Sequence, residues 1–283
     1  MSALSYQHLP WNLRKVVNMV NKTPVRKVTR GPRRSSEQIR TLLVEAGLCI
    51  VAEDGLANGA EHLTFKRVFD YLEQHEQIRL THASVIRRVF ESQEDYQTAV
   101  LKVIATRGAE DLTSEARTIV HEIILQSDLS TEELRRKCLT EVVRVSGNTA
   151  SEVLRTSPMW RAWIGVWALS ASGNQSTAAK EIKDALSATY DEIDRSALEF
   201  YTQAMAIFGI RFKSGISTHS FTVAASSIIE GCSLRDLVDA SKVAPVELPT
   251  GPKGELQTWS LQSMALMALV DSLTETDAEA FPN

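Results

Sequence analysis

Cysteine is scarce in this sequence, and the positions of its cysteines argue against disulfides and zinc sites. The three residues, Cys49, Cys138 and Cys232, are far apart and show no CxxC spacing. An odd number of cysteines without paired spacing indicates neither a disulfide framework nor a zinc site. We expect all three to be buried as small apolar side chains, with a redox-sensing thiol as the alternative.

Familiar catalytic and cofactor motifs are also absent. The chain contains no GxxxxGK, GxGxxG, HExxH or GxSxG sequence, so the common nucleotide-binding and hydrolytic arrangements have no anchor. Its six histidines are scattered without i, i+4 pairing. We therefore expect no catalytic residues, no metal site and no cofactor, and the chain is not predicted to be an enzyme.

Long apolar runs and a secretory leader are missing as well. No run approaches the roughly 20 residues of a membrane helix, and the N-terminus lacks a secretory h-region. With 43% hydrophobic and 23% charged residues, the composition is that of a soluble globular protein. We expect a cytoplasmic location.

Strand-like alternation is not evident, whereas helical spacing recurs almost to the C-terminus, so the fold class is predicted to be all-α. The length of 283 residues suggests two units. Beyond residue 94, helices are expected near 95–106, 113–126, 131–145, 151–171, 177–208, 218–230, 234–240 and 256–274.

The most informative stretch is Thr81 to Tyr96, THASVIRRVFESQEDY. At helical spacing one side is apolar, formed by Val85, Ile86, Val89 and Phe90. The other side carries Thr81, Ser84, Arg87 and Arg88. Hydroxyls and guanidinium groups on one helix face can bond base edges and phosphates in a major groove, so this segment is predicted to be a DNA-reading helix that Thr81 caps. A further helix is expected to begin at Ser92, followed by Glu94 and Asp95.

Three segments together resemble the DNA-binding domain of the TetR family. The tail Phe90 to Tyr96 is similar to the end of that domain, Ile39 to Gly55 to its first helix, and Thr64 to Leu72 to its second. The resemblance implies a bacterial transcriptional regulator that binds double-stranded DNA as a homodimer. It also implies an N-terminal three-helix helix-turn-helix domain followed by a larger helical ligand-binding and dimerisation domain. Thr64 and Lys66 on the second helix, and His82 at the start of the third, are further candidate DNA contacts. Lys66 and Arg67 are available for phosphates or form an ordinary solvated face, and the alternative for His82 is a surface histidine without a DNA contact.

Charge is distributed unevenly along the N-terminal third of the chain. Eight Lys or Arg and no Asp or Glu precede Glu37, whereas residues 37–96 contain six basic and eleven acidic residues. Residues 1–35 are therefore predicted to be a basic arm that follows phosphates or enters a minor groove. Its candidate DNA contacts are Arg26, Lys27, Arg30, Arg33 and Arg34. A solubilising tail and a transit peptide are the alternatives.

The remaining chain, residues 97–283, follows a helix-turn-helix domain expected over 36–96. Trp160, Trp163 and Trp167 form an aromatic stripe that either lines a pocket for an apolar small-molecule effector or packs in a core. Phe221 to Val238 and the last helix resemble the paired helices through which TetR subunits dimerise; the alternative is that they close the monomer core.

Two functions therefore stay open at the level of sequence. The first is a regulator that binds a two-fold-related operator and is controlled by a ligand. The second is a TetR-like helical interaction protein that has lost operator recognition and binds a protein partner. The acidic 37–96 segment, and Gln93 where the family usually has Lys, favour the second.

Overall fold

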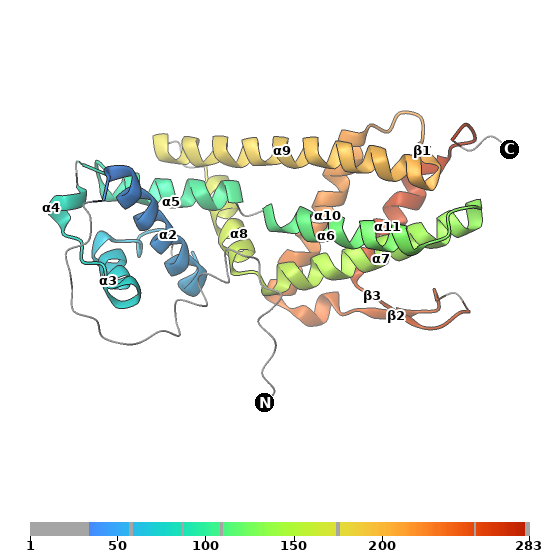
Figure 1. Cartoon of the computed structure of the whole chain (residues 1–283), viewed down its shortest axis with the longest axis horizontal. Coiled ribbons are helices and arrows are strands. Elements are labelled where there is room, and N and C mark those ends of the chain that lie inside the picture. Colours follow the sequence, from blue (N-terminus) through green and yellow to red (C-terminus); the bar gives the residue numbers. More distant parts are fainter. Residues whose placement is uncertain are drawn as a thin grey trace. The chain divides into compact units, whose positions relative to one another are not determined.

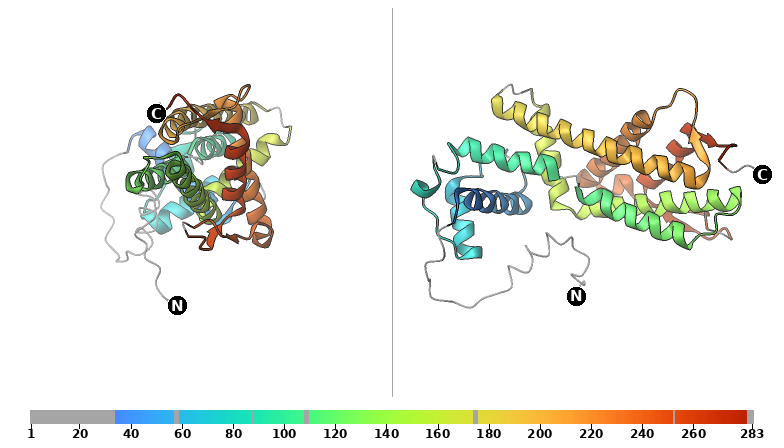
Figure 2. Two further views of the ribbon diagram at one scale, coloured as in Figure 1. Left: turned by 90° about the vertical axis from the view of Figure 1, so that its right-hand side faces the viewer. Right: turned by 45° about the horizontal axis from the view of Figure 1, so that its top comes forward.

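The computed structural model describes residues 34–56, 59–86, 88–107, 110–173, 176–251 and 253–280 (Figures 1 and 2). The chain is mostly helical, as predicted, but it also contains short pairs of strands that were not predicted. It divides into two compact units. Among the described residues, the first unit contains those between 34 and 107 together with those between 158 and 188, and the second contains those between 110 and 157 together with those between 189 and 280.

The first unit is built from helices with clear local start signals. Its elements are α2 (Ser36–Asp54), α3 (Phe65–Glu76), α4 (His82–Val85), α5 (Gln93–Arg107), α8 (Pro158–Ala171) and the beginning of α9 (Thr177–Phe208). Ser35 and Gln38 form a capping box at the start of α2, and Gly55 ends that helix with φ 72°. Thr64 caps α3 by accepting the Arg67 amide at 3.2 Å, and Ser92 accepts the Asp95 amide at 3.1 Å. The predicted helix start at Ser92 is confirmed, and the segment from Thr64 to Leu72 that resembles a second helix is helical.

Aromatic side chains join the helices of the first unit. The Tyr96 ring lies 5.3 Å from the Phe65 ring and 5.3 Å from the Phe90 ring, measured between centroids. All three residues are almost completely buried. The Tyr96 hydroxyl donates to the Leu43 carbonyl at 3.2 Å, which links α5 to α2. Burial raises the pKa of Tyr96, so the hydroxyl stays protonated as the donor.

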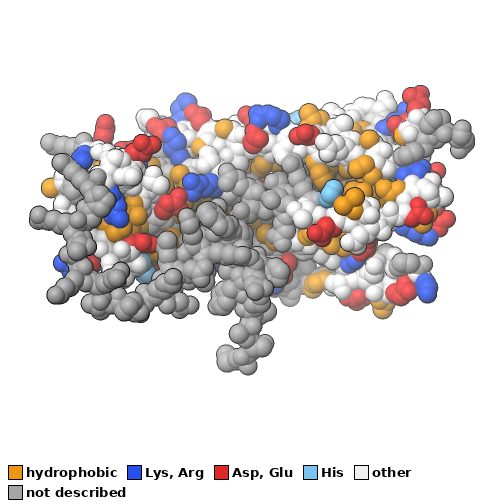
Figure 3. All heavy atoms as spheres, in the orientation of Figure 1, with side chains coloured by type: hydrophobic (Ala, Val, Ile, Leu, Met, Phe, Trp, Pro, Cys, Tyr) orange, Lys and Arg blue, Asp and Glu red, His pale blue; other side chains and the backbone are white. Residues whose placement is uncertain are grey.

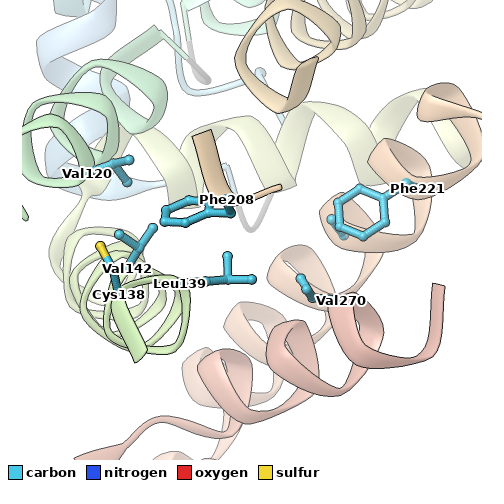
Figure 4. Packing of buried hydrophobic residues seen from close by; sticks show 8 residues of the cluster. Val120, Cys138, Leu139, Val142, Phe208, Phe221 and Val270 are labelled. Atoms are coloured by element: carbon cyan, nitrogen blue, oxygen red, sulfur yellow. The ribbon is translucent and has the colours of Figure 1, made fainter. Parts of the chain in front are cut away.

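The second unit has its own helical core. It contains α6 (Glu110–Gln126), α7 (Glu132–Thr156), the remainder of α9, α10 (Thr218–Val238), η2 (Ala240–Val243) and α11 (Leu261–Leu273). Figure 4 shows the buried cluster between them, formed by Val120, Cys138, Leu139, Val142, Phe208, Phe221, Ala225 and Val270. Because Phe221 near the start of α10 and Val270 near the end of α11 share this cluster, the two helices run in opposite directions.

Two antiparallel strand pairs complete the second unit. β1 (Ile210–Phe212) pairs with β4 (Thr274–Thr276), and β2 (Val246–Leu248) pairs with β3 (Gln257–Trp259). Strands of three residues are too short to show the alternation by which a strand is recognised from sequence. In the described ranges, no helix combines the length and the apolar character needed to cross a membrane.

The predicted interruption after residue 145 is wrong, because α7 continues to Thr156. Gly147 and Asn148, which fall in the predicted gap, contact α11. A Cβ at Gly147 would lie 2.7 Å from Ser263 Oγ, and the Asn148 side chain accepts the Ser260 amide at 2.8 Å. The helix ends immediately before Pro158, which disfavours helical backbone at the preceding residue.

The last three predicted helical segments also need correction. Residues 218–240 were divided into two helices, but α10 is continuous through Gly231 and Ser233, whose hydroxyl donates to the Ile229 carbonyl at 2.8 Å. The final helix starts at Leu261 rather than near 256. Gln257–Trp259 pairs as β3, and Ser260 then caps α11 by accepting the Ser263 amide at 3.0 Å.

The cysteines are buried to different degrees. Cys138 is buried, as predicted, whereas Cys49 and Cys232 are only partly buried. Burial raises the pKa of both partly buried thiols. A raised pKa lowers the fraction of reactive thiolate at neutral pH, which disfavours a redox-sensing role.

Candidate nucleic-acid interface

The segment predicted as a reading helix is shorter than expected. Its helical part, α4, ends at Val85, where the Val85 carbonyl accepts the amides of Arg88, Val89 and Phe90 at 3.2, 2.8 and 3.4 Å. The prediction of one helix running to Phe90 is therefore wrong. Phe90 lies in the aromatic core beside Tyr96, and its amide donates to the carbonyl five residues back rather than four, which departs from a regular α-helix.

The apolar side of the segment behaves as predicted. Val85 and Phe90 are 0% and 1% exposed, and Ile86 and Val89 are half-buried. The segment is therefore anchored at both ends by side chains in the core of the first unit. Its polar residues are left at the surface.

The candidate contact residues fall into three groups. Arg34, Lys66, Thr81, His82 and Arg88 are exposed. Thr64 is half-buried and acts as the α3 cap, and exposed Arg67 forms an ion pair with Asp54. Arg26, Lys27, Arg30, Arg33 and Arg87, and the side chain of Ser84, lie outside the described residues.

His82 combines exposure with packing. Its ring lies edge-on to Phe65 and Phe69, with centroids 5.5 and 6.0 Å away. These contacts fix the start of α4 against α3. They also limit the orientations from which the imidazole could reach a base or phosphate.

Two arginines connect the turn after α4 to the start of α2. The Arg40 guanidinium carbon lies 4.3 Å from the centroid of the Phe90 ring, and Arg40 Nη1 donates to the Val89 carbonyl at 3.1 Å. Arg88 Nε donates to Ser36 Oγ at 3.3 Å. Arg40 is not predicted as a site residue, because no local pattern pairs it with Val89, 49 positions away in sequence.

Ion pairs with acidic side chains neutralise part of the positive charge of the first unit. Arg67 pairs with Asp54, Arg79 with Glu73 and Arg107 with Glu45. In the part of the chain that the structure describes, no ion pair involves Lys66 or Arg88. Figure 3 shows Lys and Arg side chains interspersed with Asp and Glu on the visible described surface, so no single sign dominates that view.

Comparison of the sequence with models of known protein families finds no match, and a search of curated proteins finds no similar sequence. The assignment of this surface therefore depends on its residues alone.

The tryptophan stripe lies on α8 in the first unit. Trp160 and Trp163 are 3% and 2% exposed and stack with centroids 5.1 Å apart. Trp167 is 45% exposed. Burial of the stacked pair favours the core-packing alternative for those two residues, and their predicted role in binding a ligand stays a prediction.

Helices α10 and α11 leave apolar side chains exposed in the second unit. Phe221 and Ala225 of α10 face the buried cluster, but Val223, Leu234 and Val238 are 46%, 38% and 88% exposed. Leu261 at the start of α11 is 39% exposed. Because the two helices are antiparallel, Leu234, Val238 and Leu261 lie toward the same end of the pair.

Proposed function

We propose that the chain is a cytoplasmic, TetR-like transcriptional regulator that binds a two-fold-related DNA operator as a homodimer. The observation that carries the proposal is the exposed polar edge of the α4 segment, anchored from behind by Val85 and Phe90. Hydroxyl, imidazole and guanidinium groups are the donors that proteins use toward base edges and phosphates. A rigid apolar anchor would present them in a fixed orientation.

The proposed dimer uses α10 and α11. Exposed Val223, Leu234, Val238 and Leu261 support this choice, because burying them against a second copy would remove apolar surface from water. A two-fold axis through this surface would pair two reading segments with two related half-sites. In this proposal the N-terminal arm supplies much of the attraction to the phosphate backbone.

An apolar small-molecule effector is part of the proposal. Trp167 supports it as the exposed member of the tryptophan stripe, because an aromatic side chain next to buried neighbours offers apolar contact area to a ligand. The expected consequence is a change in DNA affinity when such a ligand is added. Titration of the DNA complex with a panel of apolar compounds would measure it.

The test of the central proposal is a gel shift with duplex fragments from the gene's own upstream region. Wild type should retain one fragment in preference to a scrambled duplex of equal length. Arg87→Ala and Arg88→Ala should each weaken that complex, since loss of one good bidentate base contact costs about 1 to 3 kcal/mol. Arg79→Ala is the matched control, because Arg79 is exposed and pairs with Glu73. Binding of both variants as tight as wild type would remove this segment from the reader role.

A second candidate is an interaction protein of the same build that has lost operator recognition. Two observations favour it: Arg67 is already paired with Asp54, and residues 37–96 carry eleven acidic against six basic residues. Under this candidate, wild type would retain no fragment over scrambled duplex, and Arg88→Ala would weaken a protein complex instead. The gel shift therefore separates the two candidates.

A further inference from the structure

We propose that Arg40 of α2 is a positioning residue that fixes the reading segment at Val89 and Phe90. This inference rests on the proposed DNA-binding function. It assigns to Arg40 a role that acts through the segment rather than through a contact with DNA.

One guanidinium group makes two contacts with consecutive residues. Its carbon lies 4.3 Å from the centroid of the Phe90 ring, which is within the range of a cation–π contact. Its Nη1 donates to the carbonyl of Val89 at 3.1 Å. The planar fork therefore holds a side chain and the neighbouring backbone at once, a combination that the single ammonium of lysine reproduces less well.

The segment needs such support because little of its structure is local. Helix α4 has four residues, fewer than an isolated helix needs to be stable. Beyond it, the amides of Arg88, Val89 and Phe90 converge on a single carbonyl, that of Val85. A carbonyl oxygen has two lone pairs, so three donors cannot all be bonded well. Tertiary contacts must therefore set the path of this turn.

Those contacts reach Phe90 from two sides. Tyr96 and Phe65 hold the ring from the core, with centroids 5.3 and 6.4 Å away. Arg40 holds it from α2. Arg88 lies between the Val85 anchor and the Phe90 anchor in sequence, so the orientation of its side chain depends on how firmly both are held.

A direct role in binding phosphate is the competing explanation, since Arg40 is exposed and carries further N–H donors. The two roles differ in their dependence on salt. A lost phosphate contact flattens the slope of log affinity against log salt by about 0.9. A lost positioning contact weakens binding and leaves that slope unchanged.

The experiment compares full-length wild type, Arg40→Ala, Arg40→Lys and Arg107→Ala. Arg107 of α5 is the matched control, because it pairs with Glu45 of α2 and, among the described residues, forms no hydrogen bond or ion pair with the segment. The measurements are amide hydrogen exchange at Val89 and Phe90, and affinity for the upstream fragment that wild type binds best, at several salt concentrations.

Arg40→Ala should raise the exchange rates and weaken DNA binding by about tenfold each, or about 1.4 kcal/mol, with an unchanged salt slope. Arg40→Lys should be intermediate, and Arg107→Ala should match wild type. Should Arg40→Ala unfold, Arg40→Lys decides the comparison. Unchanged exchange at Val89 and Phe90, or a slope flattened by about 0.9, overturns the positioning role. Failure of wild type to bind any fragment overturns the proposed DNA-binding function. The exchange rates at Val89 and Phe90 are measured without DNA, so they test the positioning role of Arg40 separately.

Discussion

Replacing Gly47 of α2 with alanine tests how closely α2 and α5 are packed in the first unit. A Cβ at this position would lie 2.5 Å from the Tyr96 hydroxyl oxygen and 2.7 Å from a methyl carbon of Val100. Both neighbours are 0% exposed. The added methyl group therefore has to displace the hydroxyl from the Leu43 carbonyl, which it meets at 3.2 Å, or push the helices apart.

Three contributions set the size of the effect. Alanine is favoured over glycine within a helix by about 1 kcal/mol. Overpacking a close-packed core costs about 1 to 3 kcal/mol. A buried hydroxyl that loses its acceptor costs about 1 to 3 kcal/mol more. The net expected loss in the free energy of unfolding is about 1 to 5 kcal/mol. Its middle value of about 3 kcal/mol corresponds to a fall of about 6 to 12 °C in thermal midpoint.

Circular dichroism during heating measures the midpoint, and the chain offers a matched control. A Cβ at Gly231 of α10 would meet nothing within 4 Å, so Gly231→Ala should show only the gain in helix propensity. Adding Tyr96→Phe to Gly47→Ala removes the closest oxygen and should recover part of the loss. The close packing of α2 against α5 at Gly47 would be refuted if Gly47→Ala melted at or above the wild-type temperature.

Three further predictions concern other parts of the chain. Val238→Glu, at a position 88% exposed, should shift sedimentation from dimer to monomer while circular dichroism keeps the helix content of wild type, and a monomeric wild type at micromolar concentration would exclude the proposed dimer. Deleting residues 1–34 should flatten the salt slope of DNA binding by about three units if three or four of the arm's basic residues touch phosphates, and an unchanged slope would show that the arm does not contribute. Burial raises the pKa of Tyr201 to about 12, so its stabilising effect should be full below pH about 10 and lost as the pH rises from about 10 to 12. Alkaline unfolding of Tyr201→Phe should lack that component, and identical alkaline profiles would contradict the assignment.

The helix starts of the first unit could be predicted because their signals are local. Ser35, Thr64 and Ser92 each accept an amide three residues ahead, and Gly55 adopts the positive φ that ends α2. Such contacts join residues within one turn, so the residue types and their spacing are sufficient. Nothing elsewhere in the chain has to be known.

Two of the errors occur where a distant residue decides the local structure. Gly147 and Asn148 are ordinary signals for a helix end, but Ser260 and Ser263 of α11 contact them and α7 continues. Phe90 fits a helical apolar face, but the aromatic core draws it into a turn. In both cases the deciding contact joins residues that are far apart in the sequence. Phe90 contacts Phe65, 25 positions earlier, and Asn148 contacts Ser263, 115 positions later.

The candidate site shows the same limit for charge, with a consequence for how DNA would be bound. Sequence can count the basic residues of 37–96 but cannot tell which are already engaged: Arg67 pairs with Asp54, and Arg40 lies on Phe90. Lys66 and Arg88 are left exposed beside an excess of acidic residues. Such a unit can orient itself on DNA through a few fixed hydrogen-bond donors, but it offers little long-range electrostatic attraction to the phosphates. In the proposed function, affinity would then come largely from the arm and specificity from the α4 segment, so truncation of the arm should lower affinity while a preference for the upstream fragment over scrambled duplex survives.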